Sequence, residues 1–152
     1  MSYRIVVGVD GSENSEHALV WANEEARLRE GGELTVVFAW QYPLIGVPGA
    51  FDRQQLEQEA KDFLRGELTA VIGDSDGVNM VVAEGDPSAS LLEACQRVEA
   101  DLLVIGSRGR GGFTGLLLGS VGQQCAVHAE CPVLIVKPSA RTAPERGVSA
   151  AV

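Results

Sequence analysis

Five short apolar segments rich in β-branched residues alternate along the chain with longer segments of helical periodicity. Each apolar segment is nearly continuous, which is typical of strands buried on both faces of a parallel sheet. We predict strands at Arg4–Asp10, Leu34–Trp40, Asn79–Glu84, Asp101–Ser107 and Pro132–Lys137. The alternation of strands and helices favours one fold class, a single doubly wound α/β domain with a five-stranded parallel sheet and helices on both faces.

The four segments between these strands have the features of helices. Their apolar residues recur at spacings of three and four, and Asp86 followed by Pro87 is typical of a helix start. We predict helices at Asn14–Glu30, Arg53–Ile72, 87–98 and Ser120–Ala129. Residues 41–52, with two prolines and two glycines, are expected to form a loop.

The composition excludes several functional classes. The 152 residues carry a formal net charge of −9, which argues against sequence-independent nucleic-acid binding, because such binding depends on clustered Lys and Arg. No segment approaches the roughly 20 apolar residues that span a bilayer, and the start of the chain lacks a signal-peptide pattern. We therefore expect a cytoplasmic protein that binds neither nucleic acid nor membranes. We expect one domain over residues 1–138 and a disordered tail over 139–152.

Few side chains of catalytic type form a pattern. The cysteines are odd in number and lack CxxC spacing, so we expect free thiols. Cys95 and Cys125 have apolar neighbours and are expected to be buried, whereas Cys131 is the more accessible candidate. His17 and His128 have no nucleophile at motif spacing, so we expect surface or helix-end positions for them. The sequence thus indicates no catalytic residue and no metal ligand set.

Residues 104–120 (VIGSRGRGGFTGLLLGS) form a glycine-rich loop between the fourth predicted strand and the last predicted helix. Gly106, Gly109, Gly119 and Ser120 have the spacing G-x2-G-x9-G-S. Glycines let a ligand approach main-chain N–H groups without meeting a Cβ, and a helix N-terminus favours anions. The chain has neither the GxxxxGK[ST] of a P-loop nor a GxGxxG after its first strand. The segment therefore predicts a phosphate-binding loop of another kind.

Three polar side chains near this loop have two interpretations each. Arg108, with Arg110, would offset the acidic charge at a phosphate site, or it is a solvated loop arginine. Ser120 and Gln123 fit an S-x-x-Q capping box, in which the Ser120 oxygen accepts from the N–H of Gln123; the hydroxyl proton would serve a ligand, or the cap has no ligand. Asp10 is suited to ribose hydroxyls or a metal, or it forms a local Asp-Gly turn.

The chain as a whole resembles the universal stress protein family over about residues 3–138. The resemblance depends on VVGVDGS near the start, GSRGRGG after the fourth strand, the GS at 119–120 and the closing CPVLIVKP. The G-x2-G-x9-G-[ST] spacing matches that of the family's ATP-binding branch. The resemblance implies a Rossmann-like sheet with strand order 3-2-1-4-5. That order would bring Asp10 and the glycine loop to one crevice.

The resemblance also implies which residues contact ATP. Val9 and Asp10 would contact adenosine, with Asp10 near the ribose, and Ala39 would help wall the adenine pocket. Ile105 and Gly106 would border the sugar and phosphates. The phosphate contacts would come from Gly109, Gly119, Ser120 and Val121.

Two further expectations follow from the resemblance. The chain departs from some ATP-binding members at Gly122, where a hydroxyl residue can occur, and the missing donor would weaken or shift the terminal phosphate. The family is homodimeric through its last strand, which here is Pro132–Lys137. An apolar edge strand otherwise exposes unpaired backbone groups, so this pairing is physically reasonable. An edge covered by the tail is the alternative.

These features predict a cytoplasmic ATP-binding stress-response regulatory protein, with the requirement for Mg²⁺ left open, rather than an enzyme. One alternative is a slow ATP-hydrolysing or phosphoryl-transferring enzyme, for which Asp10 and two arginines are present but no evident base. The other alternative is a dimeric interaction module whose glycine loop binds no nucleotide.

Overall fold

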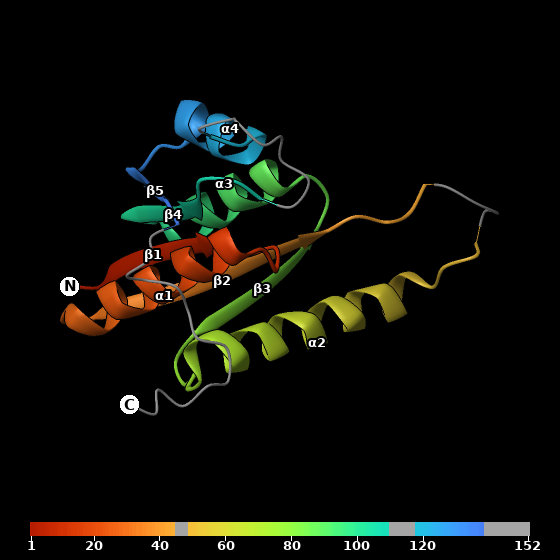
Figure 1. The fold of residues 1–152 in the computed structure, drawn as a ribbon, viewed down its shortest axis with the longest axis horizontal. Helices are drawn as coiled ribbons and strands as arrows, with labels where there is room; N and C mark the ends of the chain where they lie inside the picture. Colours follow the sequence, from red (N-terminus) through yellow and green to blue (C-terminus); the bar gives the residue numbers. More distant parts are fainter. Residues whose placement is uncertain (45–48, 110–117, 139–152) are drawn as a thin grey trace.

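The computed structural model describes residues 1–44, 49–109 and 118–138. Its strands form one parallel sheet in the order β3-β2-β1-β4-β5 (Figure 1), which confirms the predicted fold class. The strands are β1 (Tyr3–Gly8), β2 (Gly32–Trp40), β3 (Asn79–Glu84), β4 (Leu102–Gly106) and β5 (Val133–Val136). The helices are α1 (Glu13–Leu28), α2 (Arg53–Ile72), α3 (Pro87–Val98) and α4 (Ser120–His128). Each end lies within two residues of its prediction. The tail expected to be disordered, 139–152, lies outside the described residues.

Helices cover both faces of the sheet, α1 and α2 on one and α3 and α4 on the other. The central strand β1 shows why, because successive residues of a strand point to opposite faces. Ile5 and Val7 pack with α1 and α2, whereas Val6 packs with α3 and α4. All three side chains are fully buried. A strand that is apolar on both sides requires helices on both sides, as its sequence indicates.

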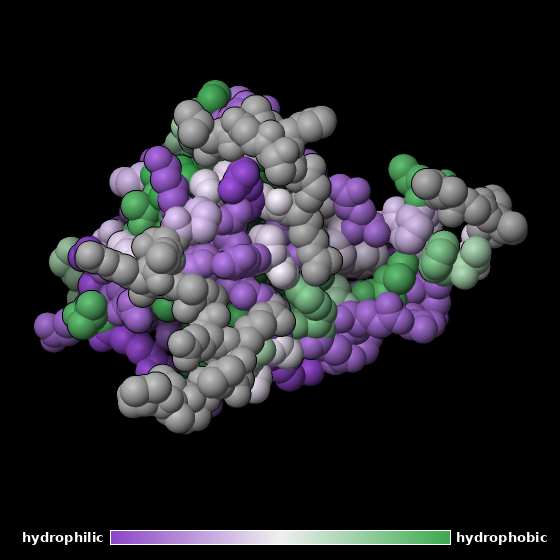
Figure 2. Space-filling model, viewed as in Figure 1, coloured by the Kyte–Doolittle hydropathy of each residue, from purple (hydrophilic) through white to green (hydrophobic). Residues whose placement is uncertain are grey.

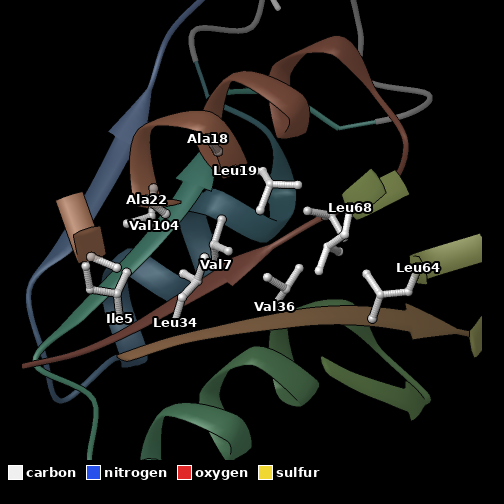
Figure 3. Close-up of a cluster of buried hydrophobic side chains, with 12 residues drawn as sticks. Ile5, Val7, Ala18, Leu19, Ala22, Leu34, Val36, Leu64, Leu68 and Val104 are labelled. Atoms are coloured by element: carbon white, nitrogen blue, oxygen red, sulfur yellow. The ribbon is translucent and has the colours of Figure 1, made fainter. Parts of the chain in front are cut away.

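The core beneath α1 and α2 combines small residues on one helix with large residues on the other (Figure 3). Ala18 and Ala22 of α1 are fully buried, and their small side chains let this helix lie close to the strands. Leu64 and Leu68 of α2 fill the space above β2 (Figure 3). Burying one leucine side chain contributes about 1.5–3 kcal/mol relative to leaving it exposed. The predicted apolar stripes of both helices are therefore their buried faces.

Side-chain oxygens cap the N-termini of α1, α2 and α3. The capping residues are Ser12, Asp52 and Asp86, and each accepts a hydrogen bond from a backbone N–H in the first turn. Pro87 occupies the first position of α3, as predicted. At this position the proline loses nothing, because that N–H has no intrahelical acceptor. These three helix starts are thus determined locally.

The surface of the longest helix is mostly hydrophilic. α2 has 20 residues, and its outward side is lined largely with polar and charged residues (Figure 2). Within the described residues, no helix combines the length and apolar character that crossing a membrane requires. At the edge of the sheet opposite β3, the four residues of β5 are half-buried, and β4 is its neighbour in this chain. Dimerisation through β5 stays a prediction.

Candidate functional site

β1 and β4 are neighbours in the sheet and end at the same edge. Ile5 pairs with Leu102 and Val7 with Val104, so the segments that follow the two strands leave the sheet side by side. Between these segments lies a pocket of about 340 Å³. All of the residues expected to contact a nucleotide line it: Val9, Asp10, Ala39, Ile105, Gly106, Arg108, Gly109, Gly119, Ser120 and Val121. The structure thus brings the expected residues together, and their contacts with a ligand stay a prediction.

Asp10 forms the local turn that the sequence left as one of its two interpretations. The N–H of Ser12 donates to Oδ1 of Asp10 at 2.9 Å. The N–H of Asp10 donates to Oγ of Ser15 at 3.2 Å, which ties the end of β1 to the first turn of α1. A carboxylate offers about four lone-pair sites, so this turn does not exclude a ligand contact. Both interpretations of Asp10 are therefore compatible.

The three motif glycines have different surroundings. A Cβ on Gly106 would lie 2.8 Å from the backbone C and O atoms of Asn14, in the first turn of α1. A Cβ on Gly109 would lie 2.5 Å from Oδ2 of Asp10. A Cβ on Gly119 would make only ordinary contacts of 3.5 Å and longer. Gly106 therefore permits close packing of α1 on β4, and Gly109 permits the two loops to approach each other.

The start of α4 shows that the predicted capping box at Ser120 is wrong. Gly119 is the N-cap, because its carbonyl oxygen accepts the N–H of Gln123 at 3.0 Å, and Ser120 is the first helical residue. The Gln123 side chain donates instead to the carbonyl of Leu118 at 3.1 Å. The N–H of Gly119 donates to the carbonyl of Ser107 at 2.8 Å, which holds residue 119 against the end of β4. This long-range bond, invisible to a local motif, determines where the helix begins.

The N-terminus of α4 has no side-chain cap, unlike those of α1, α2 and α3. The first N–H groups of a helix have no intrahelical acceptor. In α4 these belong to Ser120, Val121 and Gly122, and all three residues line the pocket. The amide of Gly119 is already engaged by Ser107. The positive end of the helix dipole and three N–H donors thus lie at the pocket, an arrangement that suits an anion.

The apolar wall of the pocket includes residues that were not anticipated from the sequence. These lining residues are Gly8, Ser15, Val37, Pro87, Leu91 and Ser107; Gly122, which the resemblance had placed near the terminal phosphate, also lines the pocket. Leu91 packs directly over β1, since a Cβ on Gly8 would lie 3.0 Å from both of its methyl carbons. Pro87 and Leu91 are four residues apart and share one face of α3. The spacing of these two residues is visible in the sequence, but the position of their helix face beside β1 depends on the crossover connection from β3.

The ionisable side chains among the described lining residues are Asp10 and Arg108. Arg108 is partly buried, and its predicted companion Arg110 lies outside the described residues. A surface or helix-end position for His17 is wrong, because this residue is only 2% exposed. It is enclosed because α1 packs across β1, β4 and β5. His128 is exposed at the end of α4, as expected, and neither histidine lines the pocket.

A sequence profile of the Universal stress protein family matches residues 1–137. The chain belongs to this family. A universal stress protein of Mycobacterium tuberculosis is 35% identical over 141 residues, which cover 89% of this chain and 45% of that protein. One from Thermus aquaticus is 32% identical over 136 residues, which cover 88% of this chain and 97% of that protein. The chain thus spans about half the length of the mycobacterial relatives that it matches.

Solved structures of universal stress proteins share the fold. One, in complex with cAMP, has a TM-score of 0.57 and 29% identity, with 91% of this chain and 98% of that chain covered. Another, from Archaeoglobus fulgidus in complex with dAMP, has a TM-score of 0.62 and 26% identity, with 89% and 98% covered. Both of those family members are therefore known with an adenine nucleotide bound.

Proposed function

We propose that this universal stress protein is a cytoplasmic stress-response regulator that binds ATP in the pocket between β1, β4 and α4. The convergence of the two strand-end loops with the uncapped N-terminus of α4 carries this proposal. Family members in complex with cAMP and dAMP support an adenine nucleotide as the class of ligand. The ATP signature G-x2-G-x9-G-S supports a longer phosphate chain.

The lining divides into an apolar and a polar part, which match the parts of a nucleotide. Ala39 and Leu91 would hold the base against apolar surface, and Asp10 would accept from the ribose hydroxyls. The N–H groups of Ser120 and Val121 would donate to phosphate oxygens at the start of α4. About 31 heavy atoms at ~0.3 kcal/mol each give roughly 9 kcal/mol, so micromolar affinity is expected.

The same lining favours binding over rapid turnover. Among the described lining residues, Asp10 carries the one carboxylate, and its Oδ1 already accepts the N–H of Ser12. Phosphoryl transfer requires a positioned nucleophile together with charge stabilisation, usually from Mg²⁺. Any Mg²⁺ would enter the pocket bound to the phosphates, and Asp10 is the carboxylate among the described lining residues that could lie beside it. We therefore propose that ATP changes conformation or partner choice rather than serving as a substrate.

We also propose a homodimer that pairs β5 with its copy. The residues of β5 are apolar and half-buried in the single chain, and the strand lies at the edge of the sheet. Pairing two such edges would satisfy exposed backbone groups and cover the apolar side chains.

Isothermal titration calorimetry tests the nucleotide proposal. ATP, AMP and cAMP are titrated into the protein with and without Mg²⁺, with GTP as the control for the base. We expect micromolar binding of ATP and much weaker binding of GTP. If no nucleotide binds with a dissociation constant below about 1 mM, the proposal is contradicted. An enzyme would be favoured instead if the protein released ADP at steady state faster than ~0.1 per second and Asp10→Ala abolished this release. Typical enzymes have turnover numbers above ~1 per second, so this threshold lies within tenfold of them.

A further inference from the structure

A second cavity, of about 360 Å³, lies between α3 and the turn from α4 to β5. It shares no lining residue with the nucleotide pocket among the described residues. Its wall includes the thiols Cys95 and Cys131 and the polar side chains of Glu99, His128 and Glu130. The proposed nucleotide-binding function uses none of these five residues.

The cysteines of this region lie in one cluster. Cys95 on α3 and Cys125 on α4 are buried in one apolar cluster, and Cys131, in the turn before β5, packs against this cluster and is half-buried. Cys131 therefore combines access from the cavity with proximity to buried thiols. No disulfide links the three residues in this structure, where all are free.

Cys95 lines the cavity together with Cys131, whereas Cys125 is not among the described lining residues. Burial, then the neighbouring charge of Cys131 and a hydrogen bond with it, raise the pKa of Cys95 to about 12. The pKa of Cys125 rises to about 11 through burial, then through the charges of Asp86 and Cys131. Both buried cysteines are thus thiols at neutral pH, and Cys95 is the one that shares a cavity wall with Cys131.

We propose that Cys95 and Cys131 are an oxidisable thiol pair, which a hydroperoxide converts into a disulfide between α3 and the turn before β5. The pair lines a cavity open to a small oxidant, and one of its members is partly exposed. This proposal is independent of nucleotide binding.

The chemistry balances in two steps. The sulfur of Cys131 attacks one oxygen of hydrogen peroxide and breaks the O–O bond; the other oxygen leaves as water with the Cys131 proton, and Cys131 becomes a sulfenic acid. The sulfur of Cys95 then attacks the sulfenic sulfur and forms the S–S bond. The displaced hydroxide leaves as a second water with the Cys95 proton. Two thiols are oxidised, and one peroxide is reduced to two waters.

Thiol counting after hydrogen peroxide treatment tests the pair. The whole protein is oxidised, unfolded, and titrated with Ellman's reagent, with and without prior reduction. We expect wild type and Cys125→Ala to lose two reducible thiols each, whereas Cys95→Ala and Cys131→Ala form no intramolecular disulfide. Cleavage after Glu130 separates Cys125 from Cys131, so mass spectrometry of the peptides identifies the linked residues. Circular dichroism shows whether each variant is folded.

Three outcomes would overturn the proposal. Wild type could keep all of its thiols at peroxide concentrations that oxidise an exposed cysteine peptide. Cys95→Ala could lose two thiols as wild type does, which would assign the bond to Cys125. Non-reducing gels could show that the only disulfide joins two chains. If alanine at position 95 unfolds the protein, the peptide map of oxidised wild type alone decides, since it identifies the linked cysteines directly.

Discussion

Substituting Gly109 by alanine provides a sharp test of how the two loops cooperate. The added methyl group would lie 2.5 Å from Oδ2 of Asp10, closer than real Cβ atoms approach an oxygen. The backbone at Gly109 is not among those with positive φ, so alanine itself is tolerated there. The carboxylate must therefore move, although its other oxygen accepts the N–H of Ser12 at 2.9 Å. The substitution should displace the Asp10 side chain while preserving the fold.

The expected size of the effect follows from the bonds that depend on the carboxylate. A hydrogen bond to a charged group contributes about 1.5–3 kcal/mol. Losing one such bond to the ribose would weaken ATP binding by about 10- to 100-fold, since 1.4 kcal/mol corresponds to tenfold. The turn bond to Ser12 would weaken as well, so a small decrease in thermal stability should accompany the loss of affinity.

A double-mutant cycle separates this mechanism from general damage. Calorimetry with ATP is performed on Gly109→Ala, Asp10→Ala and the double variant. Once Asp10 lacks its carboxylate, the methyl group at 109 no longer meets the described atom that it would displace, so the double variant should bind as Asp10→Ala does. Gly66→Ala on α2 is the matched control, because a Cβ there meets open space and Gly66 is not among the described residues that line the pocket.

Two results would refute the reasoning. Gly109→Ala could bind ATP as tightly as wild type, which would show that the carboxylate adjusts without loss. The effects of the two substitutions could instead be additive, which would show that position 109 acts on the ligand independently of Asp10.

Three further predictions concern stability and assembly. Gly106→Ala should lower the free energy of unfolding by about 1–3 kcal/mol in urea titration, because its methyl group would meet the backbone of Asn14 rather than a flexible side chain. Asp86→Ala removes the cap of α3 and should cost about 0.5–2 kcal/mol near neutral pH. Hydrogen bonds from the Ser88 side chain, then from the N–H of Ala89, lower the pKa of Asp86 in the folded protein. The stabilisation is therefore present above the unfolded pKa of about 3.9 and is lost as the pH falls through the lower pKa of the folded state. The unfolding free energies of wild type and variant should thus converge in strong acid. Analytical ultracentrifugation should give the mass of a dimer, and a monomer at all concentrations would contradict pairing through β5.

Much of the fold was predictable because its signals are local. Apolar β-branched runs, alanines at spacing four and the Asp86-Pro87 start each depend on residues close together in the chain. The glycine spacing identified one side of the pocket for the same reason. The opposite wall was missed, since Leu91 reaches the pocket only because α3 crosses back over β1.

The errors have a common physical cause. The sequence around Ser120 fits a capping box. However, a hydrogen bond from the N–H of Gly119 to the carbonyl of Ser107, at the end of β4, makes Gly119 the N-cap, one residue earlier than the box requires. His17 has the polarity of a surface residue, yet α1 is enclosed on that side by the sheet. In both cases a long-range contact was stronger than a local preference.

Sequence by itself determined the order of strands and helices and the glycines of the loop, because hydrophobic periodicity and backbone freedom are properties of neighbouring residues. Only the tertiary structure decided what each glycine is for and which thiols line the same cavity. The sequence does not distinguish the three glycines of the motif. In the structure, Gly106 faces the backbone of α1, Gly109 faces the carboxylate of Asp10, and Gly119 has only ordinary van der Waals contacts. The reason is physical: a missing Cβ matters only through the atom that occupies its place, and that atom comes from a distant part of the chain.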